Sequence, residues 1–314
     1  MTHETDRTSE PAFAPPPVAG TRPVHHPATF VPPRRRRTRW IPVVVGLAVA
    51  AGLVWWEWPG LISGALTDEE PAFAVPALAE LSAEPPADGY PLFGGDDLVR
   101  HIERGLIAQD GRIDVTDWAR TEDQMDAVRD AAYEAVAQSP YAFVDRWTIY
   151  SIPGRTEVRP VYEYSAEEAE RRRAVTVSAV ERAVVEAGVR EAVGDEAKVA
   201  RIYDYLAAVA DYDWEAYRAI ERGESTALVA RSQEAYGILV DGTAVCGGYS
   251  MAFQAMARAA GLDVVTVSGS DSAGETGGSH AWNKVRVDGR WRLVDITWDD
   301  DGATARRDYF LLAD

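Results

Sequence analysis

The stretch from Tyr236 to Asp300, YGILVDGTAVCGGYSMAFQAMARAAGLDVVTVSGSDSAGETGGSHAWNKVRVDGRWRLVDITWDD, decides how this chain folds. It holds the only cysteine of the protein, Cys246, and the only histidine after residue 101, His280. Apolar residues recur at helical spacing after the cysteine, at Tyr249, Phe253, Met256 and Ala260. This spacing predicts a helix over residues 246–260 that Cys246 opens. Unpaired backbone N–H groups and the positive end of the helix dipole favour a thiolate at that position.

The second half of the stretch has the pattern of β-strands. Residues 264–267 form a short β-branched run, and a loop rich in glycine and serine follows over residues 269–279. Two further apolar runs, 280–287 and 290–298, are separated by Asp288-Gly289. An Asp-Gly pair between two such runs is typical of a two-residue turn, so we expect an antiparallel hairpin here.

The turn also predicts which residues of the hairpin face each other. With a two-residue turn, the numbers of directly opposed residues sum to 577, so Trp282 faces Asp295. Side chains alternate between the two faces of a strand, so His280 shares the face of Trp282 and is a diagonal neighbour of Asp295. Diagonal neighbours lie roughly 7–8 Å apart, which their side chains can bridge. A slip of one residue would move Asp295 to the other face.

A cysteine at a helix start, a histidine and a carboxylate form the general pattern of covalent catalysis. Three blocks carry them in that order, GTAVCGGYSMAF (242–253), SHAWNKVRVDGRW (279–291) and LVDITWDD (293–300). These blocks resemble the transglutaminase-like superfamily, and EAKVARIYDYLAAVADYDW (196–214) extends the resemblance more weakly upstream. The resemblance implies an α+β fold of the papain-like/transglutaminase type, in which the helix packs on an antiparallel sheet.

The same resemblance implies a role for each residue of the triad. Cys246 would be the nucleophile, His280 the general base and acid, and Asp295 the carboxylate that orients the histidine. Each residue alone also has an ordinary structural explanation: a lone cysteine is usually a buried small hydrophobe, and Asp295 could cap a strand end. Their order around one turn favours the catalytic interpretation. The alternative is a non-catalytic module that binds envelope peptides on the same fold.

The expected reaction is acyl transfer through a thioester, on peptide or protein amides, to water or to a primary amine. Both acceptors are open at this point. The backbone N–H of Cys246 and one side-chain donor would hold the oxyanion, and Tyr236 is the candidate donor. Its alternative role is packing in the core. Trp282 is a candidate for lining the substrate groove, or it simply covers the sheet.

The first part of the chain has the composition of a membrane anchor. Residues 1–39 are rich in proline and arginine, and we expect a disordered tail. The apolar run over residues 40–58 predicts a single transmembrane helix, and the positive-inside rule places the tail in the cytoplasm and the later residues outside the cell membrane. Residues 59–95 have the composition of a linker. A buried helix, or a signal peptide cleaved near Ser63-Gly64-Ala65, is the alternative.

The rest of the chain divides into two expected regions. Residues 96–190 predict a helical and αβ region, and residues 191–314 form the transglutaminase-like core. One cysteine excludes an intramolecular disulfide, and the five histidines lack the spacing of a zinc site, so we expect neither a metal nor a cofactor. A net charge of −18 opposes nucleic-acid binding. The expected partners are peptide or protein substrates, for example of the cell envelope, and the membrane.

Overall fold

A computed structural model describes residues 73, 75, 77, 81–270, 279–300 and 306–313. The expected tail over residues 1–39, the expected transmembrane helix over residues 40–58 and most of the linker lie outside these residues. Among the helices that are described, none combines the length and the apolar character needed to cross a membrane. Membrane anchoring therefore stays a prediction.

The N-terminal lobe, residues 97–162, packs two helices on a small antiparallel sheet. Its elements are α2 (Asp97–Ile107), β1 (Ile113–Asp114), η2 (Thr116–Trp118), α3 (Glu122–Gln138), β2 (Val144–Ile152) and β3 (Arg155–Tyr162), with the strands in the order β1-β3-β2. The helices begin at capping residues, because the side chains of Asp96 and Thr121 accept backbone N–H groups of the first turns of α2 and α3. The lobe has its own apolar centre, which includes Ile102, Val128 and Val158.

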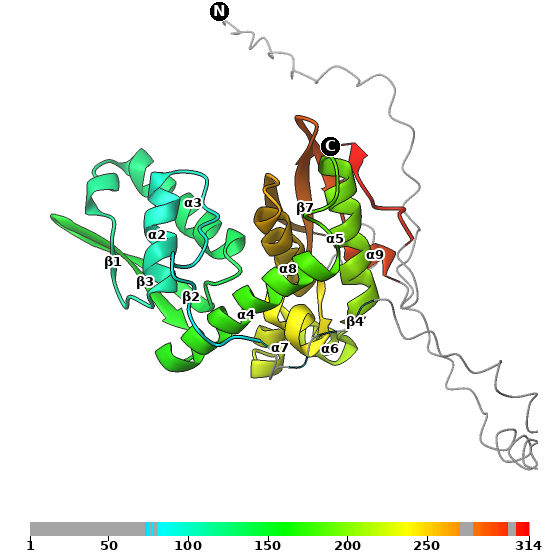
Figure 1. Cartoon of the computed structure of the whole chain (residues 1–314). Helices are drawn as coiled ribbons and strands as arrows, with labels where there is room; N and C mark the ends of the chain where they lie inside the picture. The colour runs from blue at the N-terminus through cyan, green and yellow to red at the C-terminus, as the bar shows by residue number, and fades with distance from the viewer. Residues whose placement is uncertain are drawn as a thin grey trace, which may run out of the picture.

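The core domain, residues 166–313, surrounds one buried helix. Its larger elements are α4 (Ala166–Glu186), α5 (Asp195–Val209), α8 (Cys246–Ala259), β6 (Val264–Ser270), β7 (Ser279–Val287), β8 (Arg290–Val294) and β9 (Leu312–Ala313). The four strands form an antiparallel sheet in the order β6-β7-β8-β9. Helix α8 contacts α4, α5 and the sheet, and Figure 1 shows it at the centre of the domain. The predicted α+β core with a helix packed on an antiparallel sheet is confirmed.

Short elements connect α5 to α8. They are β4 (Asp211–Tyr212), α6 (Trp214–Glu221), α7 (Ala227–Ser232), the π-helical turn η3 (Gly237–Asp241) and β5 (Thr243–Ala244). Strands β4 and β5 are parallel, with Tyr212 beside Ala244. The backbone N–H of Asp213 donates to the carbonyl of Ala244 at 2.8 Å. This pairing brings Tyr212 next to the start of α8.

The hairpin has the register that its turn predicts, but its second strand is shorter than expected. Each β7–β8 pair, from Asn283 with Val294 to Val287 with Arg290, sums to 577. Strand β8 ends at Val294, and the next residues form the short helix α9 (Ile296–Asp299) instead of a strand through Trp298. The reason is local, since the Asp295 side chain accepts the backbone N–H of Trp298 at 3.3 Å and so begins a helical turn.

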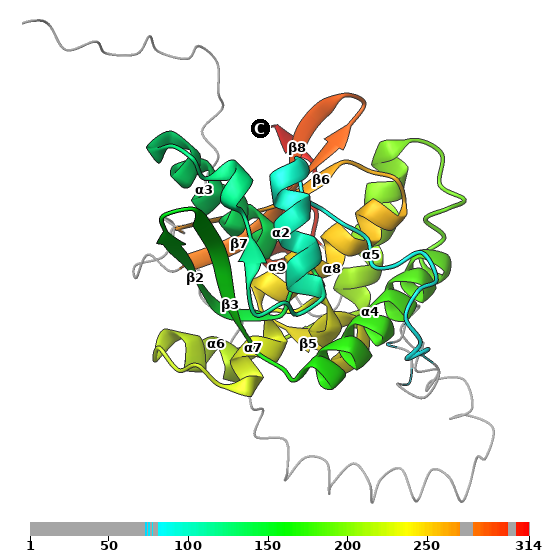
Figure 2. The same cartoon turned by 90° about the vertical axis from the view of Figure 1, so that its left-hand side faces the viewer.

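The N-terminal lobe contacts the edge of the core sheet through the end of α3. The amide of Gln138 bonds both backbone groups of Thr266, donating to its carbonyl at 2.8 Å and accepting its N–H at 2.9 Å. Gln254 of α8 donates to the backbone carbonyl of Gln138 at 2.5 Å. The side chain of Gln138 thus takes the place of a neighbouring strand for one residue of β6. Figure 2, seen from the side of the lobe, shows the lobe in front of α8 and β7.

Candidate active site

Cys246 is the first residue of α8 and is partly exposed. The residue before it, Val245, has no side-chain acceptor, so it does not cap the first N–H groups of the helix. Those groups have no partner within an α-helix. The backbone around residue 233 lies close to this turn, since a Cβ on Gly248 would be 2.7 Å from the carbonyl oxygen of Ser232. A larger side chain at Gly248 would therefore clash with the end of α7. The start of α8 packs directly against that end.

The imidazole of His280 and the carboxylate of Asp295 form a direct buried contact. The Nε2 atom of His280 lies 2.6 Å from Oδ2 of Asp295, and the two residues are 9% and 3% exposed. His280 also interacts with the thiol of Cys246, and this interaction contributes to its raised pKa. Since Nε2 is used by Asp295, Nδ1 is the nitrogen left for the sulfur. The structure thus brings the three candidate residues together in the order sulfur, imidazole, carboxylate.

The charge state of His280 follows from its neighbours. Burial opposes a charged ring, but hydrogen bonds to Asp295 and Cys246, together with their negative charges, raise the pKa of His280 from 6.5 to about 10. At neutral pH the ring is therefore an imidazolium beside the sulfur. This state favours an ion pair with a thiolate, the form in which cysteine is nucleophilic.

Two indole rings lie nearly parallel to the His280 ring. The Trp282 ring is 5.8 Å from it at 23°, and the Trp298 ring is 4.8 Å from it at 7°. Trp282 therefore borders the imidazole, as its place on the same strand face predicts. Trp298 was not among the residues expected at the site. Its signal in the sequence is its place three residues after Asp295, which becomes meaningful only once a helical turn replaces the expected strand.

The expected oxyanion donor, Tyr236, lies elsewhere. Its ring packs under the guanidinium of Arg172 at 3.9 Å, and its hydroxyl interacts with Arg171, so it faces the arginines of α4. Tyr212 is better placed for this role, because it pairs with Ala244, two residues before Cys246. Burial raises the pKa of Tyr212, and the negative charge of Cys246 adds to that effect. The packing alternative for Tyr236 thus fits the geometry, and Tyr212 is the new candidate for the donor.

Tyr212 belongs to an aromatic wall on one side of the site. Its ring lies 4.7 Å from Trp214, 6.1 Å from Tyr217 and 6.4 Å from Tyr249. The sequence contains these residues within ADYDWEAY and CGGY, but no local pattern joins the two segments. Their contact depends on the pairing of β4 with β5, which is non-local. Sequence reasoning therefore had no means of choosing Tyr212 over Tyr236.

Trp282 has one further property. Its Nε1 atom is buried and has no hydrogen-bond partner among the residues that the structure describes. The ring also packs closely on strand β6, where a Cβ on Gly269 would be 2.8 Å from it. A buried donor without a partner is uncommon, because it loses its bond to water and gains none in return. Trp282 thus presents an unused donor beside His280.

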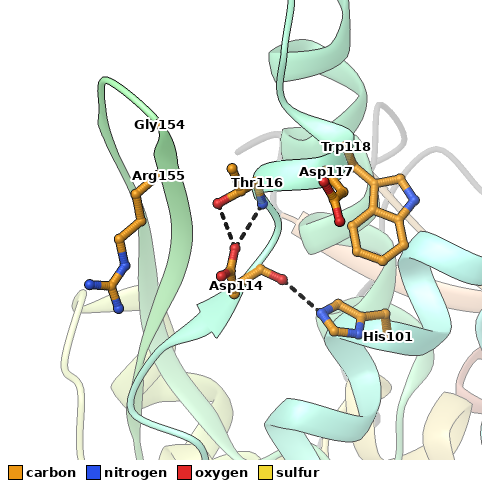
Figure 3. A pocket seen from close by; sticks show the side chains of 7 residues that line it. All are labelled: His101, Asp114, Thr116, Asp117, Trp118, Gly154 and Arg155. Carbon is orange, nitrogen blue, oxygen red and sulfur yellow. Dashed lines mark hydrogen bonds between the residues drawn. The ribbon is translucent and has the colours of Figure 1, made fainter.

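A hollow of about 680 Å³ lies in the N-terminal lobe, away from the thiol. Figure 3 shows His101, Asp114, Trp118 and Arg155 on its walls. Its polar groups bond locally: His101 contacts the carbonyl of Asp114 at 2.8 Å, and the Asp114 carboxylate accepts from Thr116 at 2.6 Å. In the described part of the chain, no group of three or more histidine, cysteine or acidic residues is arranged to hold a metal. The triad remains the candidate site with reactive chemistry.

Part of the chain is similar to a known protein family. Residues 182–296 match the model of the transglutaminase-like superfamily, a range that contains all three residues of the triad. The kyphoscoliosis peptidases of Mus musculus and Homo sapiens are 49% and 48% identical over 61 residues, which is 17% of this chain and 9% of each relative. The matching segment thus spans about a tenth of the length of these relatives. A crystal structure of a TGase aligns with 60% of this chain and 50% of its own, at 18% identity and a TM-score of 0.36.

Proposed function

We propose that this protein, which contains a transglutaminase-like core over residues 182–296, is a cysteine-dependent enzyme of acyl transfer on peptide or protein amides. One observation carries the proposal: the buried ring of His280 lies 2.6 Å from the Asp295 carboxylate and also interacts with Cys246. A structural histidine needs one partner, whereas a base that moves a proton from a thiol needs this pair.

The first half of the reaction forms a thioester. The sulfur of Cys246 attacks the amide carbonyl carbon, and the C–N bond breaks after the amine nitrogen takes the proton from Nδ1 of His280. Asp295 holds the ring through Nε2, so that Nδ1 stays directed at the sulfur and the leaving group. The products are a free amine and an acyl group on Cys246.

Charge on the carbonyl oxygen needs hydrogen-bond donors. The N–H groups at the start of α8 are free of intrahelical partners, and the N–H of Cys246 is the nearest to the reacting carbon. The hydroxyl of Tyr212 is the second donor, because its raised pKa keeps it protonated and its residue pairs with Ala244, two residues before Cys246. Helix dipole and hydroxyl then act on the same oxygen.

The second half of the reaction decides the class of enzyme. The neutral imidazole left after the first half takes a proton from water, which gives hydrolysis, or from a primary amine such as a lysine side chain, which gives cross-linking. In both cases the new bond forms at the acyl carbon and the C–S bond breaks. We place this chemistry on peptides or proteins at the outer face of the cell membrane, on the basis of the arginine-rich tail and the apolar run over residues 40–58.

Alkylation of the single cysteine tests the proposal. Iodoacetamide should modify Cys246 at least ~10 times faster than free cysteine at about pH 6–7, and His280→Ala should remove that advantage. Mass spectrometry of the alkylated full chain reads the result without a known substrate. A rate equal to that of free cysteine would leave a non-catalytic peptide-binding module. Incorporation of a labelled amine into a glutamine peptide, set against cleavage of the same peptide, then separates the two enzyme classes.

A further inference from the structure

The indole of Trp298 is joined to the triad at two points. Its ring lies almost flat on the His280 ring, with the centroids 4.8 Å apart at 7°. Its backbone N–H donates to Oδ1 of Asp295 at 3.3 Å, while Oδ2 of the same carboxylate contacts His280. One short helix, α9, thus places an aromatic face against the imidazole and fixes the acid that holds it.

A segment from the far end of the chain supports this helix. The Tyr309 ring meets Trp298 edge-on, with the centroids 4.8 Å apart at 74°. The backbone carbonyl of Tyr309 accepts the N–H of Asp295 at 3.1 Å, and its N–H donates to the Asp299 carboxylate at 2.8 Å. Asp299 also accepts from the buried hydroxyl of Tyr203. The C-terminal segment, residues 306–313, is therefore fastened to both ends of α9.

We propose that Trp298 is a positioning residue for His280, and that Tyr309 braces it from behind. The proposal rests on the proposed function only in taking His280 as the catalytic base. A flat indole restricts rotation of the ring, keeps water from the bond to Asp295, and presents a π face to an imidazolium cation. Each effect keeps the proton on Nδ1 directed at the sulfur of Cys246.

Five titratable groups face His280 or its partners. Cys246 comes from α8, Asp295 from the start of α9, Tyr203 from α5, Tyr212 from β4 and Tyr309 from the C-terminal segment. Burial lowers the pKa of His280 and its hydrogen bonds raise it, so a variant that admits water would change both effects at once. A clean test must keep the apolar cover and remove only the π face.

Comparison of phenylalanine with leucine at position 298 meets this requirement. Both side chains are apolar and similar in volume, but only phenylalanine has a π face. The full chain, with ¹³C-labelled histidine, is titrated by NMR as the parent, Trp298→Phe and Trp298→Leu. We expect the ring protons of His280 to lie further upfield in the parent and in Trp298→Phe than in Trp298→Leu, where only the Trp282 ring remains stacked on the imidazole. The pKa of His280 in the leucine variant should be lower than in the phenylalanine variant by about 0.5 to 1. His101, which lies 4.9 Å from Trp118 in the other lobe, is the internal reference and should not change.

Equal titration of His280 in the two variants would overturn the proposal. If Trp298→Leu does not fold, Tyr309→Leu decides in its place, because it leaves the indole present and removes only the brace. That variant should lose part of the upfield shift, and an unchanged shift contradicts the proposal. Trp291→Leu, at a tryptophan that is 40% exposed on β8, is the matched control and should leave His280 as in the parent. These signals need no substrate, so they test the stack even if alkylation shows that Cys246 is not catalytic.

Discussion

Asp295 gives one carboxylate oxygen to His280 and the other to the helix that follows. Oδ2 lies 2.6 Å from the Nε2 atom of His280, and Oδ1 accepts the backbone N–H of Trp298 at 3.3 Å. The residue therefore has a chemical task and a structural one, and its two simplest substitutions separate them.

Asp295→Asn should remove the chemical task and keep the structural one. Asparagine caps a helix about as well as aspartate, but it carries no charge to hold the imidazolium. We expect acyl transfer to fall by about 10²- to 10⁴-fold, as for the acid of other triads, with the cap of α9 kept. Asp295→Ala should lose the same activity and be about 1 kcal/mol less stable than Asp295→Asn, because it loses the cap as well. Activity assays and urea unfolding of the two variants check this, and equal stability of both would mean that the cap does not stabilise α9.

The site shows what a sequence can and cannot specify. The Asp-Gly turn sets the register of β7 and β8, because a two-residue turn determines which residues of the two strands lie opposite each other. His280 therefore meets Asp295 as expected. The turn of helix after Asp295 was missed because a capping aspartate looks the same as the end of a strand. Tyr212 was missed for another reason: it reaches Cys246 through a two-residue parallel pairing with no local signature.

The same contrast between local and non-local interactions applies to the fold. Helix starts at Asp96 and Thr121 depend on residues within one turn, so they can be read from the sequence. One contact between the lobes joins Gln138, a polar side chain at the end of α3, to the strand edge that it meets in the other lobe. Nothing near Gln138 in the sequence indicates that edge.

The stability of the protein should depend on the charge of His280. The pKa of His280 is raised from 6.5 to about 10 in the folded state, so its contribution is fully present below about pH 6.5 and is lost as the pH rises through about 10. We expect the free energy of unfolding of the parent to fall over this window by more than that of His280→Gln. Urea unfolding at intervals from about pH 6 to 10 measures both curves, and parallel curves would show that the pKa of His280 is not raised.

Tyr212 and Tyr236 offer a matched pair of substitutions. Tyr212→Phe removes the hydroxyl beside Cys246, and we expect acyl transfer to fall by about 10²-fold, as for the loss of one oxyanion donor. Tyr236→Phe removes a hydroxyl that faces Arg171, so its activity should stay near that of the parent. Steady-state kinetics with one amide substrate compares the two. A larger loss in Tyr236→Phe would restore the tyrosine that the sequence favoured.

Trp282→Phe removes the buried Nε1 donor and keeps an aromatic ring on the sheet. A buried donor without a partner costs about 1–3 kcal/mol, so we expect no loss of stability from its removal, despite the smaller ring. If the donor binds a substrate carbonyl, kcat/KM for a peptide substrate should fall by about 10-fold, while alkylation by iodoacetamide stays unchanged. Thermal unfolding and the two rate measurements check this. Unchanged kcat/KM would leave Trp282 as cover for the sheet.

Gln138→Ala should loosen the N-terminal lobe from the core. The substitution removes two hydrogen bonds and leaves the backbone N–H and carbonyl of Thr266 without their partner, at a site that is 8% exposed. Since each such loss costs about 1 kcal/mol, we expect the free energy of unfolding to fall by about 2 kcal/mol. Hydrogen exchange at the amide of Thr266 should accelerate, and exchange in α5 should not. Asp130→Ala, on the exposed face of the same helix, is the control and should change neither. A Thr266 amide that stays protected in Gln138→Ala would mean that the strand edge is closed by something other than this side chain.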